Sequence, residues 1–200
     1  MQNEVPLEEV KIYFLLADAL KDKTRNHKLL GLKVLEEEYL RELNWLNSLN
    51  DERLSARITD KIKLGKYNSM TWYKGEKPLS DMGVWPLAKE LDFILTNESP
   101  IQSAEIIKNL SPEARRKLIS KKEDDRFESI RSLIDFVYPR FPLILLPGGT
   151  IREGYNLWAE EHDKPVCTKF LEFDINDGNS RAIAYALEGI QEAPVYFGVK

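Results

Sequence analysis

The sequence predicts a mixed α/β protein, in which a mainly helical N-terminal part precedes a C-terminal unit of the βαβ type. Two observations carry this prediction. Between residues 26 and 50, apolar side chains recur at helical spacing with charged side chains between them, as in an amphipathic helix. From Phe127 onward, helical and strand-like segments alternate, and such alternation indicates parallel βαβ units. We therefore expect a helical region over 1–90 and an α/β domain over 91–200.

The N-terminal region begins with an apolar run, Val10–Leu16, which is too short for periodicity to distinguish a strand from a helix. The next segment predicts a helix with these large side chains on one face: Leu32, Leu35, Tyr39, Leu43 and Leu46. We expect that face to pack on its own domain, and partner binding is the alternative. Trp72–Trp85 combines aromatic residues with prolines and glycines, which predicts an ordered loop. Its aromatic side chains either pack against the scaffold or stack on a base or sugar.

The C-terminal domain begins with Leu91–Thr96, a strand or a short buried helix. Ser111 and Pro112 are typical of an N-cap and the first helical position. Leu143–Leu146 is apolar without alternation, as expected of a strand buried on both faces. Further strands are expected over Lys164–Phe173 and 193–200, with helices after the turns at 147–150 and 176–180.

The composition restricts the classes of function. Hydrophobic residues make up 42% of the chain, which allows a core, and charged residues make up 31% with a net charge of −4. Nucleic acid is therefore an unfavourable partner, because no positive surplus is present to displace counterions. Cys167, His27 and His162 are too few and too scattered for a usual zinc site, so we expect neither metal nor cofactor. No signal peptide or membrane-spanning run is visible, and we expect a cytoplasmic location.

The turn Pro147-Gly148-Gly149-Thr150 has the clearest functional pattern. It lies between a predicted strand and a predicted helix, at the edge where open α/β sheets bind ligands. Glycines let a ligand approach the backbone, and the first amides of a helix favour an anion. We predict that Gly148, Gly149 and Thr150 bind a phosphate. Glu153 then stabilises or attacks an anomeric carbon, whereas in a purely structural alternative Thr150 and Glu153 form a capping box.

This turn, with Glu153 and the later Lys164-Pro165-Val166, resembles two families of Rossmann-like nucleotide-processing proteins. One is the LOG type, which is lysine-decarboxylase-like, and the other is the nucleoside 2-deoxyribosyltransferases. The resemblance implies a Rossmann-like C-terminal unit that binds a nucleotide or nucleoside and cleaves or transfers its N-glycosidic bond. It implies catalytic roles for Glu153 and for an arginine on the preceding helix, Arg131, with Arg126 as the other candidate. The turn is two residues shorter than the PGGxGT of the LOG type.

A second resemblance, carried by 141–154 and 166–174, is to the ParB/sulfiredoxin-like fold. In that fold a strand and a hairpin lead to an I-x-D-G sequence and then to a helix with a phosphate-contacting arginine. Here Glu153-Gly154 stands in place of Asp-Gly, and Asn156 and Leu157 stand where the arginine is expected. The resemblance implies a regulatory or DNA-associated module with a degenerate site.

Three functions therefore remain open. The first is a nucleotide- or nucleoside-binding protein with N-glycosidic chemistry, and the second is the ParB/sulfiredoxin-like module. The third is a protein-interaction domain without a small-molecule site, because fold alone does not decide function. The sequence leaves a homo-oligomer open and does not decide whether the protein is an enzyme.

Overall fold

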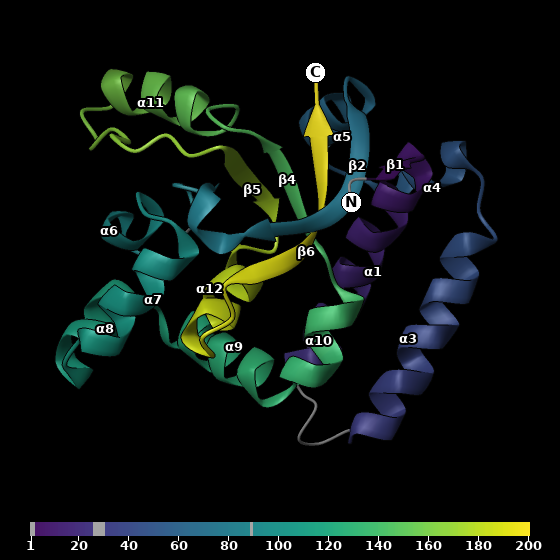
Figure 1. The fold of residues 1–200 in the computed structure, drawn as a ribbon, viewed down its shortest axis with the longest axis horizontal. Coiled ribbons are helices and arrows are strands. Elements are labelled where there is room, and N and C mark those ends of the chain that lie inside the picture. The colour runs from purple at the N-terminus through teal and green to yellow at the C-terminus, as the bar shows by residue number, and fades with distance from the viewer. Residues whose placement is uncertain (1–2, 26–30, 89) are drawn as a thin grey trace.

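A mixed β-sheet crosses the middle of the protein in the computed structural model, which describes residues 3–25, 31–88 and 90–200 (Figure 1). Within these ranges the sheet contains β1 (Asn3–Val5), β2 (Thr71–Pro78), β3 (Met82–Gly83), β4 (Leu143–Pro147), β5 (Phe173–Asp177) and β6 (Glu192–Val199). The spatial order is β1-β2-β6-β4-β5-β3. β4 is parallel to β6 and β3 to β5, whereas the other neighbouring pairs are antiparallel.

Helices surround the sheet, with α1, α3 and α4 along one side of the molecule in Figure 1 and α6–α8 along the other. The described helices are α1 (Leu7–Arg25), α3 (Leu32–Asn47), α4 (Asp51–Arg57), α5 (Lys61–Asn68), the 3-10 helix η1 (Leu79–Asp81), α6 (Phe93–Thr96), α7 (Pro100–Asn109), α8 (Pro112–Leu118), α9 (Lys121–Ser132), α10 (Ile134–Arg140), α11 (Arg152–Glu161) and α12 (Asn179–Leu187). None of the helices in the described ranges is both long and apolar enough to cross a membrane.

The mixed α/β class is confirmed, but the prediction of successive parallel βαβ units is wrong for β4 and β5. These two strands are antiparallel, with Pro147 opposite Phe173 and Ile144 opposite Asp177. The connection through α11 and residues 162–172 returns the chain to the same end of the sheet at which β4 ends. β5 therefore runs antiparallel to β4, without the crossover connection of a βαβ unit. The strand predicted over Lys164–Phe173 is also wrong, because β5 begins at Phe173 and the preceding segment is irregular.

The predicted aromatic loop is a strand over Thr71–Pro78. β2 pairs with β6 along its whole length, from Thr71 opposite Val199 to Pro78 opposite Glu192. The Trp72 side chain is buried, as expected of a scaffold role, and its indole N–H donates to the Tyr67 carbonyl at 3.0 Å. Strands from both sides of residue 90 thus belong to one sheet.

The core lies on both faces of β4. Leu143 and Leu145 belong to the larger apolar cluster, whereas Ile144 and Leu146 belong to a second cluster with Trp72. The expected strand buried on both faces is therefore confirmed. The smaller cluster includes residues of α1, so the apolar run Val10–Leu16 is part of a helix that covers the sheet.

The amphipathic helix is confirmed as α3, which packs against α1. Leu35, Tyr39 and Leu46 are buried, whereas Leu32, at the first turn, is 52% exposed. Ser111 is confirmed as an N-cap, since its side chain accepts a hydrogen bond from the Ala114 amide at 3.2 Å.

Candidate functional site

The glycine turn between β4 and α11 uses its own amides within the protein. Gly148 N donates to the Glu172 carbonyl at 2.8 Å, and Thr150 N donates to the Pro147 carbonyl at 3.1 Å. A Cβ atom on Gly148 would lie 1.9 Å from the Leu171 carbonyl oxygen, so glycine is required here by the close approach of another backbone segment. Two of the three predicted phosphate-binding residues therefore direct their amides at carbonyl groups.

The start of α11 is capped by Asp174 of β5. Asp174 Oδ2 accepts hydrogen bonds from Ile151 N at 2.7 Å and from Arg152 N at 3.2 Å. The N-cap position is Ile151 and not Thr150, and no side chain of the N-cap residue takes part. The Asp174 carboxylate thus lies where an anionic ligand would lie at this helix N-terminus. Burial raises the pKa of the Asp174 carboxyl, and the two N–H groups and Arg152 act in the opposite direction.

The predicted catalytic residues do not come together. Glu153 is exposed on the first turn of α11, with its side chain beside Gly149. Arg131 lies on α9 and forms ion pairs with Glu128 and Glu188. The hydrogen bond to Glu188 raises the pKa of the Arg131 guanidinium further. Arg126, the other candidate, lines a pocket in a different part of the molecule.

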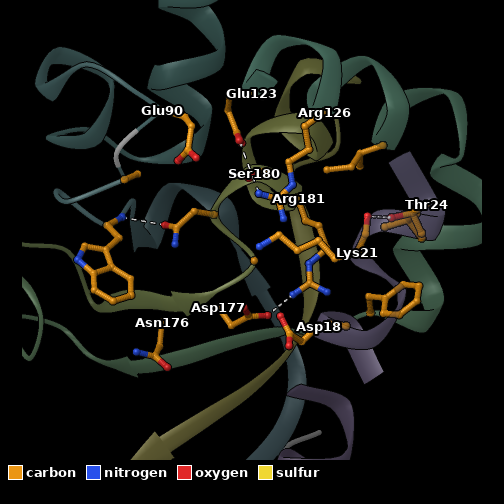
Figure 2. Close-up of a pocket in the computed structure, with 18 of the residues that line it drawn as sticks. Asp18, Lys21, Thr24, Glu90, Glu123, Arg126, Asn176, Asp177, Ser180 and Arg181 are labelled. Atoms are coloured by element: carbon orange, nitrogen blue, oxygen red, sulfur yellow. Dashed lines mark hydrogen bonds and ion pairs between the residues drawn. The ribbon is translucent and has the colours of Figure 1, made fainter. Parts of the chain in front are cut away.

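That pocket has a volume of about 590 Å³ and lies between α1, α9, the start of α12 and residues 85–88 and 90–91 (Figure 2). Its size is in the range of small-molecule and cofactor sites. Apolar groups such as Trp85, Leu91 and Phe141 form part of its wall. Its polar lining includes the whole stretch from Asn176 to Arg181.

The N-terminus of α12 opens onto this pocket. Gly178 has a φ of 100°, which L-residues rarely adopt, and a Cβ atom there would lie 2.6 Å from Leu143 Cδ2. Ala182 N donates to the Gly178 carbonyl at 2.9 Å, and Gly178 offers no side chain to cap the amides before that bond. The Asn179 side chain instead accepts a hydrogen bond from Trp85 N at 2.8 Å. The first amides of α12 are therefore available to a ligand.

Charged side chains surround this helix terminus. Lys21 of α1, Lys63 of α5, Arg126 of α9 and Arg181 of α12 all line the pocket, and Arg181 pairs with Asp177. The same pocket is also lined by four carboxylates, those of Asp18, Glu90, Glu123 and Asp177, so its charge is mixed. The amides at the start of α12, and not a surplus of cations, are what favours an anion here.

Glu123 of α9 differs from the other acidic residues of the pocket in being buried with an unpaired carboxylate oxygen. It is 3% exposed, and its Oε1 has no hydrogen-bond partner in the described structure. Arg126 Nη1 lies 3.6 Å from its other oxygen, Oε2. Figure 2 shows Glu123 and Arg126 reaching from α9 toward Ser180 and Arg181. The pocket therefore combines the uncapped start of α12 with a buried carboxylate.

The floor of the pocket is held by Asn176, whose Oδ1 accepts a hydrogen bond from the Tyr67 hydroxyl at 2.8 Å. Burial raises the pKa of Tyr67 well above its usual value, so this hydroxyl remains a donor at neutral pH. The Asn176 side-chain oxygen is thereby held in position.

The sequence prediction missed this place, although a signal was present. Ile175-Asn176-Asp177-Gly178 is an I-x-D-G sequence that leads into a helix, and Arg181 follows three residues after Gly178. The sequence prediction considered an I-x-D-G pattern only at Glu153-Gly154. In the structure, Ile175–Gly178 lies at the start of α12.

Metal-binding side chains do not gather in the described residues, where no group of three or more potential ligands is present. Cys167 is buried, and burial raises the pKa of its thiol. His162 stacks on Trp158, and His27 lies outside the described residues. Comparisons with known protein families, curated proteins and solved structures found no match.

Proposed function

We propose that this protein binds a nucleotide in the pocket at the start of α12. The observation that carries the proposal is the uncapped N-terminus of α12, which opens between Arg126 and Arg181. The phosphate accepts hydrogen bonds from the first amides of α12, and the arginines neutralise its charge. The sugar and base then extend along the apolar wall near Trp85 and Phe141.

The Ile175–Gly178 sequence supports the second of the three open functions, a ParB/sulfiredoxin-like regulatory module. The phosphate-contacting arginine that this resemblance requires is absent after Glu153-Gly154, and we propose Arg181, three residues after Gly178, for that role. Glycosidic chemistry at Glu153 has less support. A phosphate that positions a sugar beside Glu153 would bind the amides at the start of α11. The Asp174 carboxylate already accepts hydrogen bonds from these amides.

Isothermal titration calorimetry with nucleoside monophosphates and triphosphates of all four bases, and with inorganic phosphate, tests the proposal. We expect at least one nucleotide to bind, and Arg181→Ala to weaken it about tenfold or more, because charge-assisted hydrogen bonds are lost. Arg181→Lys keeps the charge and is the second variant if Arg181→Ala unfolds. Arg116→Ala, at an exposed arginine of α8, is the matched control.

Arg131→Ala distinguishes nucleotide binding in this pocket from binding at the glycine turn predicted from the sequence. We expect it to leave nucleotide affinity unchanged, because Arg131 pairs with Glu128 and Glu188. Binding that is lost in Arg131→Ala or Gly149→Asp, and is kept in Arg181→Ala, would overturn the proposal and return the phosphate to the glycine turn.

A further inference from the structure

An open groove between α3 and α4 presents an exposed tryptophan together with two arginines. The groove has a volume of about 440 Å³ and is lined by Trp45, Leu49, Arg53, Ala56 and Arg57. Trp45 is 38% exposed, which is high for a residue type that is mostly buried in folded proteins. The groove therefore leaves an apolar floor open to a partner.

The two arginines of this groove carry charge that the described structure leaves unpaired. The Arg57 guanidinium lies over the Trp45 ring, 4.1 Å from its centroid. A guanidinium stacked in this way still directs its N–H groups outward from its edge. No carboxylate of the described residues forms an ion pair with Arg53 or Arg57, and the lining contains no acidic side chain. The groove thus favours an occupant that is apolar at its centre and acidic at its rim.

The exposed face of α11 has the complementary pattern. Leu157, in the middle of this helix, is 68% exposed. Three exposed glutamates share its helical face, four residues before it and three and four residues after it: Glu153, Glu160 and Glu161. None of these glutamates forms an ion pair within the described residues. A leucine is therefore surrounded by carboxylates on α11, whereas arginines adjoin an apolar floor in the groove.

The two surfaces lie on opposite sides of one molecule. Figure 1 shows α11 at one side and α3 and α4 along the other, so α11 does not fill the groove of its own chain. We propose that α11 of one molecule binds the α3–α4 groove of a second copy. Leu157 packs on the apolar floor, and the glutamates of α11 pair with Arg53 and Arg57. A helix that places an apolar side chain in a groove is a recurring mode of recognition.

The proposed contact joins two different surfaces, so it is heterologous. Each molecule uses its groove for one neighbour and its α11 for another, and association proceeds head to tail as an open chain or a closed ring. The residues that line the pocket at α12 belong to neither surface. The inference is therefore independent of the proposed nucleotide binding.

Sedimentation velocity of the wild-type protein at increasing concentration is the first test. Between about 10 µM and about 500 µM at low salt, we expect the average mass to rise about twofold or more. The association should weaken at about 0.5 M NaCl, because salt screens exposed charges. A wild-type protein that stays monomeric at the highest concentration overturns the inference.

Charge reversal of the two surfaces tests their complementarity. The groove variant combines Arg53→Glu with Arg57→Glu, and the α11 variant combines Glu160→Arg with Glu161→Arg. Each variant has like charges on both surfaces and should stay monomeric by itself. An equimolar mixture sets opposite charges against each other again, and its association constant should return to within about threefold of wild type. If the mixture stays monomeric, the proposed pairing is wrong, provided that the melting temperatures show both variants to be folded.

The apolar part of the contact has its own matched pair of variants. Leu157→Ala should weaken association about tenfold or more, because the central apolar side chain is lost. Leu32→Ala, at a 52% exposed leucine at the opposite end of α3 from the groove, should leave association unchanged. Arg116→Glu, at an exposed arginine of α8, controls for net charge. If Leu157→Ala has no effect, or if Arg116→Glu weakens association as much as the groove variant, the assignment of these surfaces is overturned.

Discussion

Arg152 and Asp174 form an enclosed ion pair, with Arg152 Nε 3.4 Å from Asp174 Oδ1 and both side chains at most 1% exposed. Asp174 also caps α11, as described above. The Arg152 guanidinium donates to carbonyl oxygens of three separate segments, those of Val84, Thr96, Asn97, Glu98 and Lys169. The pair therefore joins the start of α11 to the loop after β3, the end of α6 and the segment before β5.

Removal of the Asp174 charge should destabilise the protein strongly. Asp174→Asn keeps the size of the side chain but leaves the buried Arg152 without its counter-ion, and such a loss costs about 3–5 kcal/mol. Urea denaturation at neutral pH measures the free energy of unfolding. Asp177→Asn is the control, because Asp177 is the more exposed partner of Arg181 at the other end of β5. A loss below about 1 kcal/mol for Asp174→Asn would contradict a structural role for the pair.

Alanine at Gly148 and alanine at Gly154 should change the free energy of unfolding in opposite directions. Gly148→Ala places a methyl group against the Leu171 carbonyl oxygen, and the backbone has to move, so we expect a loss of about 2–4 kcal/mol. Gly154 lies inside α11 with open space around it, and Gly154→Ala should stabilise by about 0.5–1 kcal/mol through helix propensity. Thermal and urea unfolding of both variants provide the measurement. Equal changes in the two variants would be inconsistent with the close approach at Gly148.

Ser99 and Thr150 both have the sequence of a helix N-cap, but they should contribute differently to the free energy of unfolding. Ser99 caps α7 in a complete capping box, so Ser99→Ala should cost about 1 kcal/mol. Thr150 has the sequence of a cap, but Asp174 caps α11 instead, so Thr150→Ala should change the free energy of unfolding by less than about 0.5 kcal/mol. Denaturant titration measures both. A cost of about 1 kcal/mol or more in Thr150→Ala would restore the capping box predicted from the sequence.

The protein should lose stability in alkali. Burial raises the pKa of Tyr39 to about 12, and burial also raises the pKa values of Tyr67, Tyr185 and Tyr196. These tyrosines stay protonated when folded but ionise near pH 10 when unfolded, so the unfolded chain holds fewer protons above that pH. Their stabilising contribution is complete below about pH 10, and each tyrosine then lowers the free energy of unfolding by up to about 1.4 kcal/mol per pH unit.

Urea titrations between pH 8 and pH 11.5 test this dependence. Tyr185→Phe should make the alkaline slope less steep, because it removes one of the tyrosines whose pKa is raised by burial. A free energy of unfolding that stays constant from pH 9.5 to pH 11.5 would contradict the assignment.

Local patterns predicted the elements whose signals are contained in a few neighbouring residues. The helical spacing of Leu35, Tyr39 and Leu46 identified α3, and the continuous apolar run Leu143–Leu146 identified a strand with two buried faces. The β2 strand escaped prediction because Gly75 and Pro78 suggest a loop. Its pairing with β6 joins segments more than a hundred residues apart, and no local signal reports such a partner.

The sequence by itself determined the mixed α/β class, the amphipathic helix α3, and two places where a helix begins after a glycine, at Gly149 and at Gly178. Only the tertiary structure decided which of these helix ends is open to a ligand. Asp174, 23 residues after Ile151, accepts the amide of Ile151 and that of the next residue, whereas α12 begins without a side-chain cap beside a pocket. The physical reason is that an amide at a helix end is satisfied by whichever acceptor the fold brings to it, and that acceptor can come from a distant part of the chain.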